Sequence, residues 1–93
     1  MKVYRIVRGY HDVNDDAVQV EMFTDKYKTL DEAKDAVIAD AESYKKDILE
    51  AFDDDDAKSV EDNDFHEYDF EREYQINYAD TEFTTYKIIE EDD

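Results

Sequence analysis

The chain has 93 residues, of which 29 are acidic and 11 basic, giving a formal net charge of −18 at pH 7. This charge argues against direct binding to nucleic acid or to an anionic membrane, and it favours a basic partner, a cation or a high-salt habitat. Without cysteine there is no disulfide framework and no thiolate metal site. Eight tyrosines and five phenylalanines indicate a folded core, so we expect one domain over residues 1–93 and not a disordered acidic tail.

The first two predicted elements form a hairpin. Residues 2–10 alternate as a strand, with Tyr4 and Ile6 on one side. Residues 17–24 alternate as a second strand, in which we expect Val18, Val20 and Met22 to face the core. Between them, residues 12–16 are rich in short polar side chains that favour a turn. The amino terminus lacks the apolar segment of a signal peptide and no window approaches a membrane span, so we expect a cytoplasmic protein without a membrane partner.

A long amphipathic helix is predicted to begin at Thr29 and end near Phe52. Thr29 and Glu32 have the spacing of a capping box. Apolar residues then recur every three or four positions, which gives one buried stripe and an outer face of mixed charge. Four aspartates follow the predicted helix end, where negative charge opposes the helix dipole, and we interpret residues 53–64 as an acidic loop.

Residues 65–78 alternate with a period of two and predict one long strand. One side of that strand is aromatic, and the other side carries Glu67, Asp69, Glu71 and Glu73. A last strand over residues 81–89 and a frayed acidic tail, residues 90–93, complete the chain. The expected fold is therefore α+β, a four-stranded antiparallel sheet in the order β-β-α-β-β with a single helix packed on one face.

The carboxylates of this predicted strand repeat about 6.8 Å apart at a rise of ~3.4 Å per residue. Neighbouring phosphates of one DNA strand are about as far apart. The candidate partner-binding residues are the strand acids and the acids of the preceding loop: Glu67, Asp69, Glu71, Glu73, Asp53, Asp54, Asp55, Asp56, Glu61, Asp62 and Asp64. A solvated sheet face would also be polar, so this acidic row is either a binding surface or merely exposed to water.

The sequence gives little support for metal binding or catalysis. Asp12, Asn14 and Asp16 match three positions of a calcium-binding EF-hand loop, but Ala17 and Phe23 occupy its required glycine and glutamate positions. The two histidines have no cysteine partners, neither serine lies in a nucleophile elbow, and one glycine cannot make a phosphate loop. We therefore expect a protein that is not an enzyme and has no cofactor or metal.

A chain of this size, with pI near 4.1, acids in rows, no cysteine and a single glycine, resembles the small phage-encoded DNA-mimic inhibitors. These include anti-CRISPR proteins, anti-restriction proteins and uracil-DNA-glycosylase inhibitors. The resemblance implies binding to the basic nucleic-acid groove of a bacterial enzyme, with a Cas9-type effector as the first choice of target. The alternatives are an acidic adaptor for a basic protein, and a cation-binding or salt-adapted protein.

Overall fold

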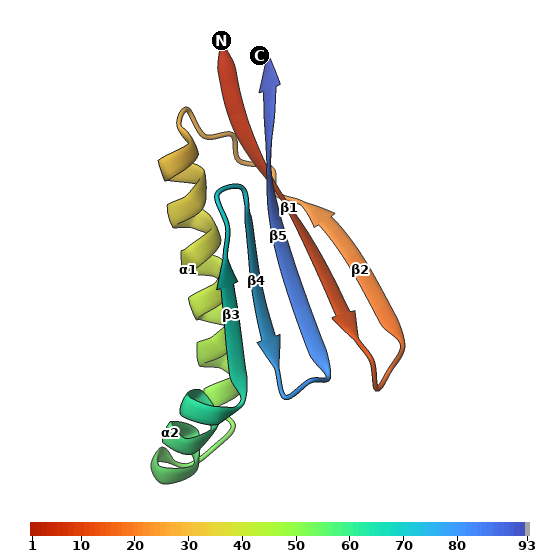
Figure 1. Ribbon diagram of the computed structural model, residues 1–93, viewed down its shortest axis with the longest axis vertical. Helices are drawn as coiled ribbons and strands as arrows, with labels where there is room; N and C mark the ends of the chain where they lie inside the picture. The colour runs from red at the N-terminus through yellow and green to blue at the C-terminus, as the bar shows by residue number, and fades with distance from the viewer. Residues whose placement is uncertain (93) are drawn as a thin grey trace.

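The computed structural model describes residues 1–92, which form five strands and two helices (Figure 1). Their bounds are β1 Lys2–Asp12, β2 Ala17–Met22, α1 Leu30–Leu49, α2 Asp54–Asn63, β3 Phe65–Asp69, β4 Glu73–Tyr78 and β5 Glu82–Asp92. All strands join one antiparallel sheet in the order β2-β1-β5-β4-β3. The prediction of four strands and one helix is therefore wrong, although the α+β class with one antiparallel sheet holds.

The predicted hairpin and the predicted start of the helix form, but β2 turns Val18, Val20 and Met22 away from the core, contrary to prediction. In the turn between β1 and β2, Asp12 accepts a hydrogen bond from the Asn14 backbone N–H at 3.0 Å, and Asp16 has a φ of 52°. Short polar side chains bond to their own backbone and tolerate a positive φ, so both features cost little free energy. At the start of α1, the Thr29 hydroxyl accepts from the Glu32 N–H at 3.1 Å. Glu32 in turn accepts from the Lys28 N–H, one residue earlier than a capping box requires.

The core lies between α1 and one face of the sheet. Ile6, Ile76 and Tyr86 are fully buried on that face, and they pack against Ala33, Val37 and Ala41 of the helix. We call this the helix side of the sheet. Alternation along β1, β4 and β5 points the intervening residues away from α1, to a face that no helix covers within residues 1–92 (Figure 1).

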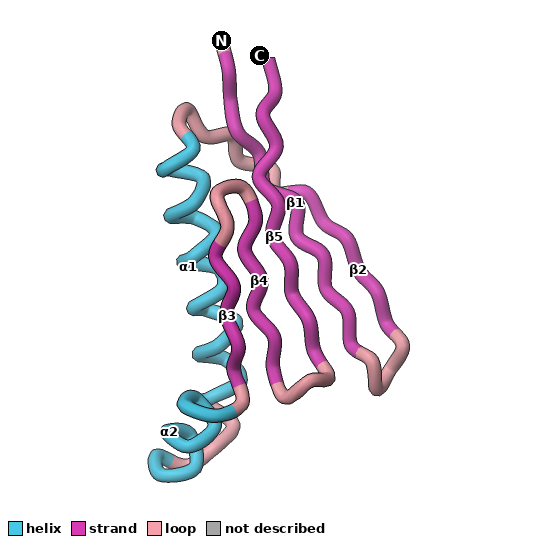
Figure 2. The backbone as a smooth tube through the Cα atoms, in the orientation of Figure 1, coloured by secondary structure: helices cyan, strands magenta, loops and turns pink. Residues whose placement is uncertain are grey.

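The predicted long strand over residues 65–78 is in fact a hairpin of β3 and β4 (Figure 2). Residues 70–72 make the turn, and the Phe70 N–H donates to the Glu73 carbonyl at 2.8 Å. A straight strand of that length would extend about 47 Å at ~3.4 Å per residue, well beyond the ~30 Å of a 20-residue helix. Folding back keeps both arms near α1 or the sheet, where Tyr74 and Ile76 are buried.

The predicted acidic loop 53–64 is wrong as well, because it contains helix α2. Helix α1 already ends at Leu49, and Asp53 is the N-cap of α2, accepting from the Asp56 N–H at 3.0 Å. The aspartates therefore lie in the first turn of a new helix, where negative charge is favourable. The predicted frayed tail is strand β5 as far as Asp92, which pairs with Lys2; Asp93 lies outside the described residues.

The chain is elongated, with a longest dimension of 48 Å, and its two termini lie side by side at one end (Figure 1). Connections between elements are short (Figure 2). Neither of the two helices in residues 1–92, α1 and α2, is long and apolar enough to cross a bilayer.

Candidate functional site

The two helices expose the densest acidic surface of the molecule. We call it the acidic helix surface. It consists of the exposed acids of α1 and of the α2 region: Asp31, Glu32, Asp35, Glu42, Asp47, Glu50, Asp53, Asp54, Asp55, Asp56, Glu61 and Asp62. The exposed bases on the same elements are Lys46 and Lys58.

Helical geometry orders the acids on α1. Asp31, Asp35 and Glu42 are separated by four and seven residues, close to one and two whole turns, so they lie along one outer line. The buried residues Ala33 and Val37 are on the opposite side of the helix. From Asp31 to Glu50 this surface extends about 28 Å at ~1.5 Å per residue.

A groove of about 580 Å³ between α1 and α2 joins their acids into one surface. Its charged lining residues are Glu42, Glu50, Asp54, Glu61, Lys45 and Lys46. Acids from both helices therefore face the same open space, at the end of the molecule where α2 lies beside β3 (Figure 1).

The structure divides the predicted row of strand acids. Glu67 and Asp69 pair with Ile76 and Tyr74, which places both acids on the helix side. There Lys45 lies 3.9 Å from Glu67, and Lys34 forms an ion pair with Asp69.

The other two acids of the row lie elsewhere. Glu71 is in the turn, and Glu73 is across from Lys87 on the face without a helix. The prediction that these four acids share one face is wrong, because the three-residue turn reverses the alternation between β3 and β4.

The acids predicted around residues 53–64 are brought together, but by a helix. Asp53 to Asp56 form the N-cap and first turn of α2, Glu61 and Asp62 follow on its last turns, and Asp64 caps its end. The row on α1 was missed because its outer face has mixed charge in the sequence. In the structure Lys34 and Lys45 turn toward β3, each with a side chain about one-fifth exposed, which leaves Lys46 as the exposed base of α1 among its acids.

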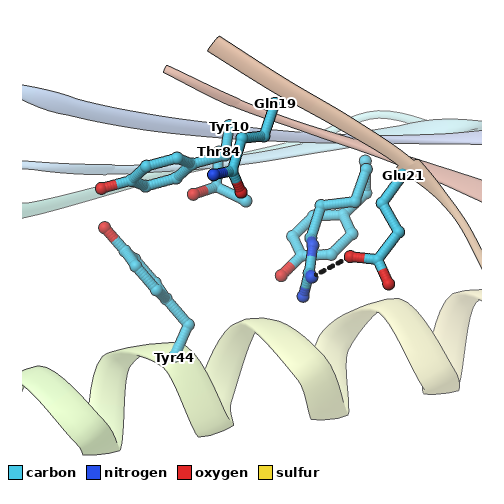
Figure 3. A pocket seen from close by; sticks show the side chains of 7 residues that line it. Tyr10, Gln19, Glu21, Tyr44 and Thr84 are labelled. Carbon is cyan, nitrogen blue, oxygen red and sulfur yellow. Dashed lines mark hydrogen bonds and ion pairs between the residues drawn. The ribbon is translucent and has the colours of Figure 1, made fainter. Parts of the chain in front are cut away.

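A separate cavity of about 310 Å³ lies between α1 and the β1–β2 hairpin (Figure 3). Its lining residues are Arg8, Tyr10, Gln19, Glu21, Tyr44, Thr84 and Tyr86. In Figure 3, Tyr44 points from the helix toward Tyr10 and Thr84 on the sheet. The cavity exists because α1 packs on β1, β5 and β4, while β2 extends beyond it (Figure 1).

Polar groups around this cavity already have partners in the protein. Arg8 binds Asp40 at 2.9 Å and Glu21 at 2.6 Å, and the Tyr86 hydroxyl donates to Asp40 at 2.5 Å. Tyr10 and Tyr44 both donate to the same oxygen of Glu82, at 2.6 and 3.3 Å.

These partners keep the tyrosines protonated. The hydrogen bond to Glu82 raises the pKa of Tyr10, and burial followed by the Glu82 charge raises that of Tyr44. Burial and the bond to Asp40 likewise raise the pKa of Tyr86. All three are therefore protonated at neutral pH, and the hydrogen bonds from Tyr44 to Glu82 and from Tyr86 to Asp40 tie α1 to the sheet.

Within residues 1–92, no three His, Asp or Glu side chains gather closely enough to hold a metal ion. The calcium motif around residues 12–16 forms the β1–β2 turn instead. No family model matches the chain, and no match was found among curated proteins or among solved structures.

Proposed function

We propose that the chain is a DNA-mimic inhibitor that uses the acidic helix surface to occupy the basic nucleic-acid groove of a bacterial defence or DNA-processing enzyme. The observation that carries this proposal is the segregation of charge. The helices collect twelve exposed acids against two exposed lysines. Like charges held side by side cost folding free energy, so a surface of this kind indicates a gain from its electric field.

The dimensions of the surface suit this role. Asp31 and Asp35 are four residues apart and so about 6 Å apart along the axis, close to the distance between neighbouring phosphates on one strand. Glu42 follows about 10 Å further along the same line. The acidic length of α1, about 28 Å, corresponds to roughly eight base pairs at ~3.4 Å each. Acids of α2 continue the surface across the groove.

This proposal moves the site away from the predicted strand row. Glu67 and Asp69 are partly neutralised by lysines of α1, and Glu73 lies on the opposite face of the sheet. The acids of the α2 region keep the role that we expected from the sequence.

A Cas9-type effector is the first target to test. Such an enzyme holds its heteroduplex in a positively charged channel and contacts the backbone rather than the sequence. A rigid acidic ridge can compete for contacts of that type. Anti-restriction and DNA-glycosylase inhibition are the same mechanism on other basic grooves, and the capture experiment below distinguishes these targets.

The test is capture from a bacterial lysate that contains CRISPR effectors, with and without excess duplex DNA. Two control columns carry variants of equal net charge. The helix variant combines D35N, E42Q, D47N, E50Q and D62N, all exposed acids of the acidic helix surface. The remote variant combines D15N, D16N, D25N, D80N and D92N, all exposed acids elsewhere.

The proposal predicts that the native chain and the remote variant retain a nucleic-acid enzyme, that duplex DNA displaces it, and that the helix variant does not retain it. Retention of a partner that duplex DNA does not displace would contradict mimicry and favour the adaptor alternative. Equal loss of binding by both variants would show that only net charge matters.

A further inference from the structure

The sheet face without a helix, which we call the open face, has an apolar and nearly neutral surface. The strand registers arrange its wider part in three rows across the sheet, and β1 and β5 continue it with the pairs Arg5–Ile89 and Val3–Glu91, where Arg5 forms an ion pair with Glu91. The rows are Met22–Val7–Lys87–Glu73, Val20–Gly9–Thr85–Gln75–Tyr68 and Val18–His11–Phe83–Asn77–His66. Val20 and Val18 are 73% and 67% exposed, and Met22 and Tyr68 are also exposed.

Acidic residues are nearly absent from these rows. Glu73 is the one acid among them, and it lies across from Lys87. In a chain with 29 acids among 93 residues, a surface of this size would ordinarily carry several. Depletion of charge together with exposed apolar and aromatic side chains is typical of the core of a protein–protein interface.

The only glycine of the chain lies in the middle of the open face. Nothing in its backbone requires glycine, because its φ is not positive and an added Cβ would find Thr85 O at 4.0 Å as its nearest neighbour. Its missing side chain leaves shallow hollows of about 220 and 320 Å³ on its two sides, bordered by Val20 and Phe83 among others. A glycine inside a strand often marks the close approach of another surface.

We propose that the open face binds a second copy of this chain, sheet against sheet, in a symmetric dimer. The near-neutral charge of the open face favours a second copy over a strongly basic partner. A strongly basic partner is attracted to the acidic helix surface, whereas a nearly neutral apolar face fits another face of the same kind. A second copy supplies one.

The geometry also limits the repulsion between two chains of charge −18. Stacked sheets lie about 10 Å apart, and both helix layers are then on the outer sides, farther apart than the Debye length of ~8 Å at physiological ionic strength. Five strands at ~4.8 Å spacing give a width of about 24 Å, and with a length of 20–30 Å the footprint is roughly 500–700 Å². This is somewhat below the ~800 Å² per partner of a standard interface, so the dimer is weak and concentration-dependent.

Sedimentation equilibrium of the full chain over a series of protein and salt concentrations tests the proposal. The mass should rise from 11.1 kDa toward twice that value with concentration, and the dimer should strengthen with added salt. Val20→Glu should weaken the dimer by at least about tenfold, because it buries an unpaired charge. Gln19→Glu is the matched control, since it adds the same charge on the same strand but on the other side.

A second substitution separates stacking from pairing of the free β2 edges. Thr85 lies on the open face of β5, two strands away from that edge, so Thr85→Glu should disrupt a stacked dimer and leave an edge-paired dimer intact. Circular dichroism confirms that each variant is folded. A monomer at every concentration and salt condition, or a dimer that survives Thr85→Glu, whether or not Val20→Glu disrupts it, would overturn the proposal.

The two proposals fail independently. Substitutions on the open face should leave capture of a basic partner by the acidic helix surface unchanged. The helix variant should still dimerise, and more tightly than the native chain because it carries less charge. Salt also acts in opposite directions, weakening capture and strengthening the dimer.

Discussion

Asp40→Ala should destabilise the fold even though it removes one negative charge from a strongly acidic protein. The Asp40 carboxylate lies on α1 and accepts from Arg8 of β1 and from the Tyr86 hydroxyl of β5. Asp35, five residues earlier on α1, is exposed and is not among the partners of Arg8 or Tyr86. Asp35→Ala therefore makes the same change in charge and helix propensity without breaking these contacts.

The magnitude follows from what each partner loses. Hydrogen bonds to charged groups contribute about 1.5–3 kcal/mol, and a buried hydroxyl left without a partner costs about 1–3 kcal/mol. Arg8 retains Glu21, whereas the hydroxyl of the fully buried Tyr86 loses the acceptor that Asp40 provides. The Asp40 side chain is 31% exposed, so solvent screening reduces the free energy that its contacts contribute. We expect a loss of about 2 kcal/mol relative to Asp35→Ala.

Thermal unfolding followed by circular dichroism measures the difference. For a domain of this size 1 kcal/mol shifts Tm by about 4–8 °C, so Asp40→Ala should melt roughly 8–16 °C below Asp35→Ala. Asp35→Ala itself should melt at or above the native temperature, because it relieves repulsion and improves helix propensity. Equal melting temperatures for the two variants would refute the role of Asp40 as a link between helix and sheet.

Three further predictions concern single sites. Thr29→Ala should cost about 1 kcal/mol in urea unfolding because it removes the cap of α1, whereas Thr29→Ser should cost little; equal losses would argue against the cap. Gly9→Ala should stabilise the monomer by about 0.5–1 kcal/mol, since the added methyl group fits without a clash, 4.0 Å from Thr85 O; destabilisation in the same assay would contradict this geometry. Burial, then the charges of Glu67 and Asp69, raise the pKa of Tyr74 to about 12. The stability that Tyr74 contributes is therefore fully present below pH 10 and is lost as pH rises from 10 through 12. Tyrosinate absorbance should show a phase near pH 12 that Tyr74→Phe removes, and a midpoint near 10 for that phase would contradict the shift.

The predictable part of the fold rests on local signals. Alternation in residues 2–10 and 17–24, the polar turn between them and the Thr29 cap each involve neighbours in sequence, and the structure confirms these elements. It reverses the expected orientation of the second strand, because Val18, Val20 and Met22 are exposed on the open face. Gln19 and Glu21 are on the helix side instead. The apolar stripe of α1 likewise identifies its buried face correctly.

The turn at residues 70–72 left no such signal. It has no glycine, proline or asparagine, and alternation of acidic and aromatic residues continues through it without interruption. Only tertiary packing decides that the strand must fold back, because a single extended strand would extend beyond the helix. That turn is also why Glu67 and Glu73 are on opposite faces of the sheet.

The four aspartates after Phe52 illustrate a second ambiguity. The same charges are unfavourable at the end of one helix and favourable at the start of the next. Because α1 was predicted to end three residues too late, Asp53 was assigned to a loop instead of to an N-cap. The acidic helix surface emerges only when Lys34 and Lys45 turn toward β3, a long-range arrangement that the sequence does not encode locally.

The most direct test of the central claim is displacement of labelled duplex DNA from a purified nucleic-acid enzyme identified by capture, with the Cas9-type effector tried first. The native chain, the helix variant and the remote variant are titrated at several salt concentrations. The account predicts that the native chain and the remote variant displace DNA equally well and that displacement weakens steeply with salt. It predicts that the helix variant is at least about tenfold weaker, which corresponds to about 1.4 kcal/mol. Equal potency of the helix variant and the remote variant would contradict the assignment of function to the acidic helix surface.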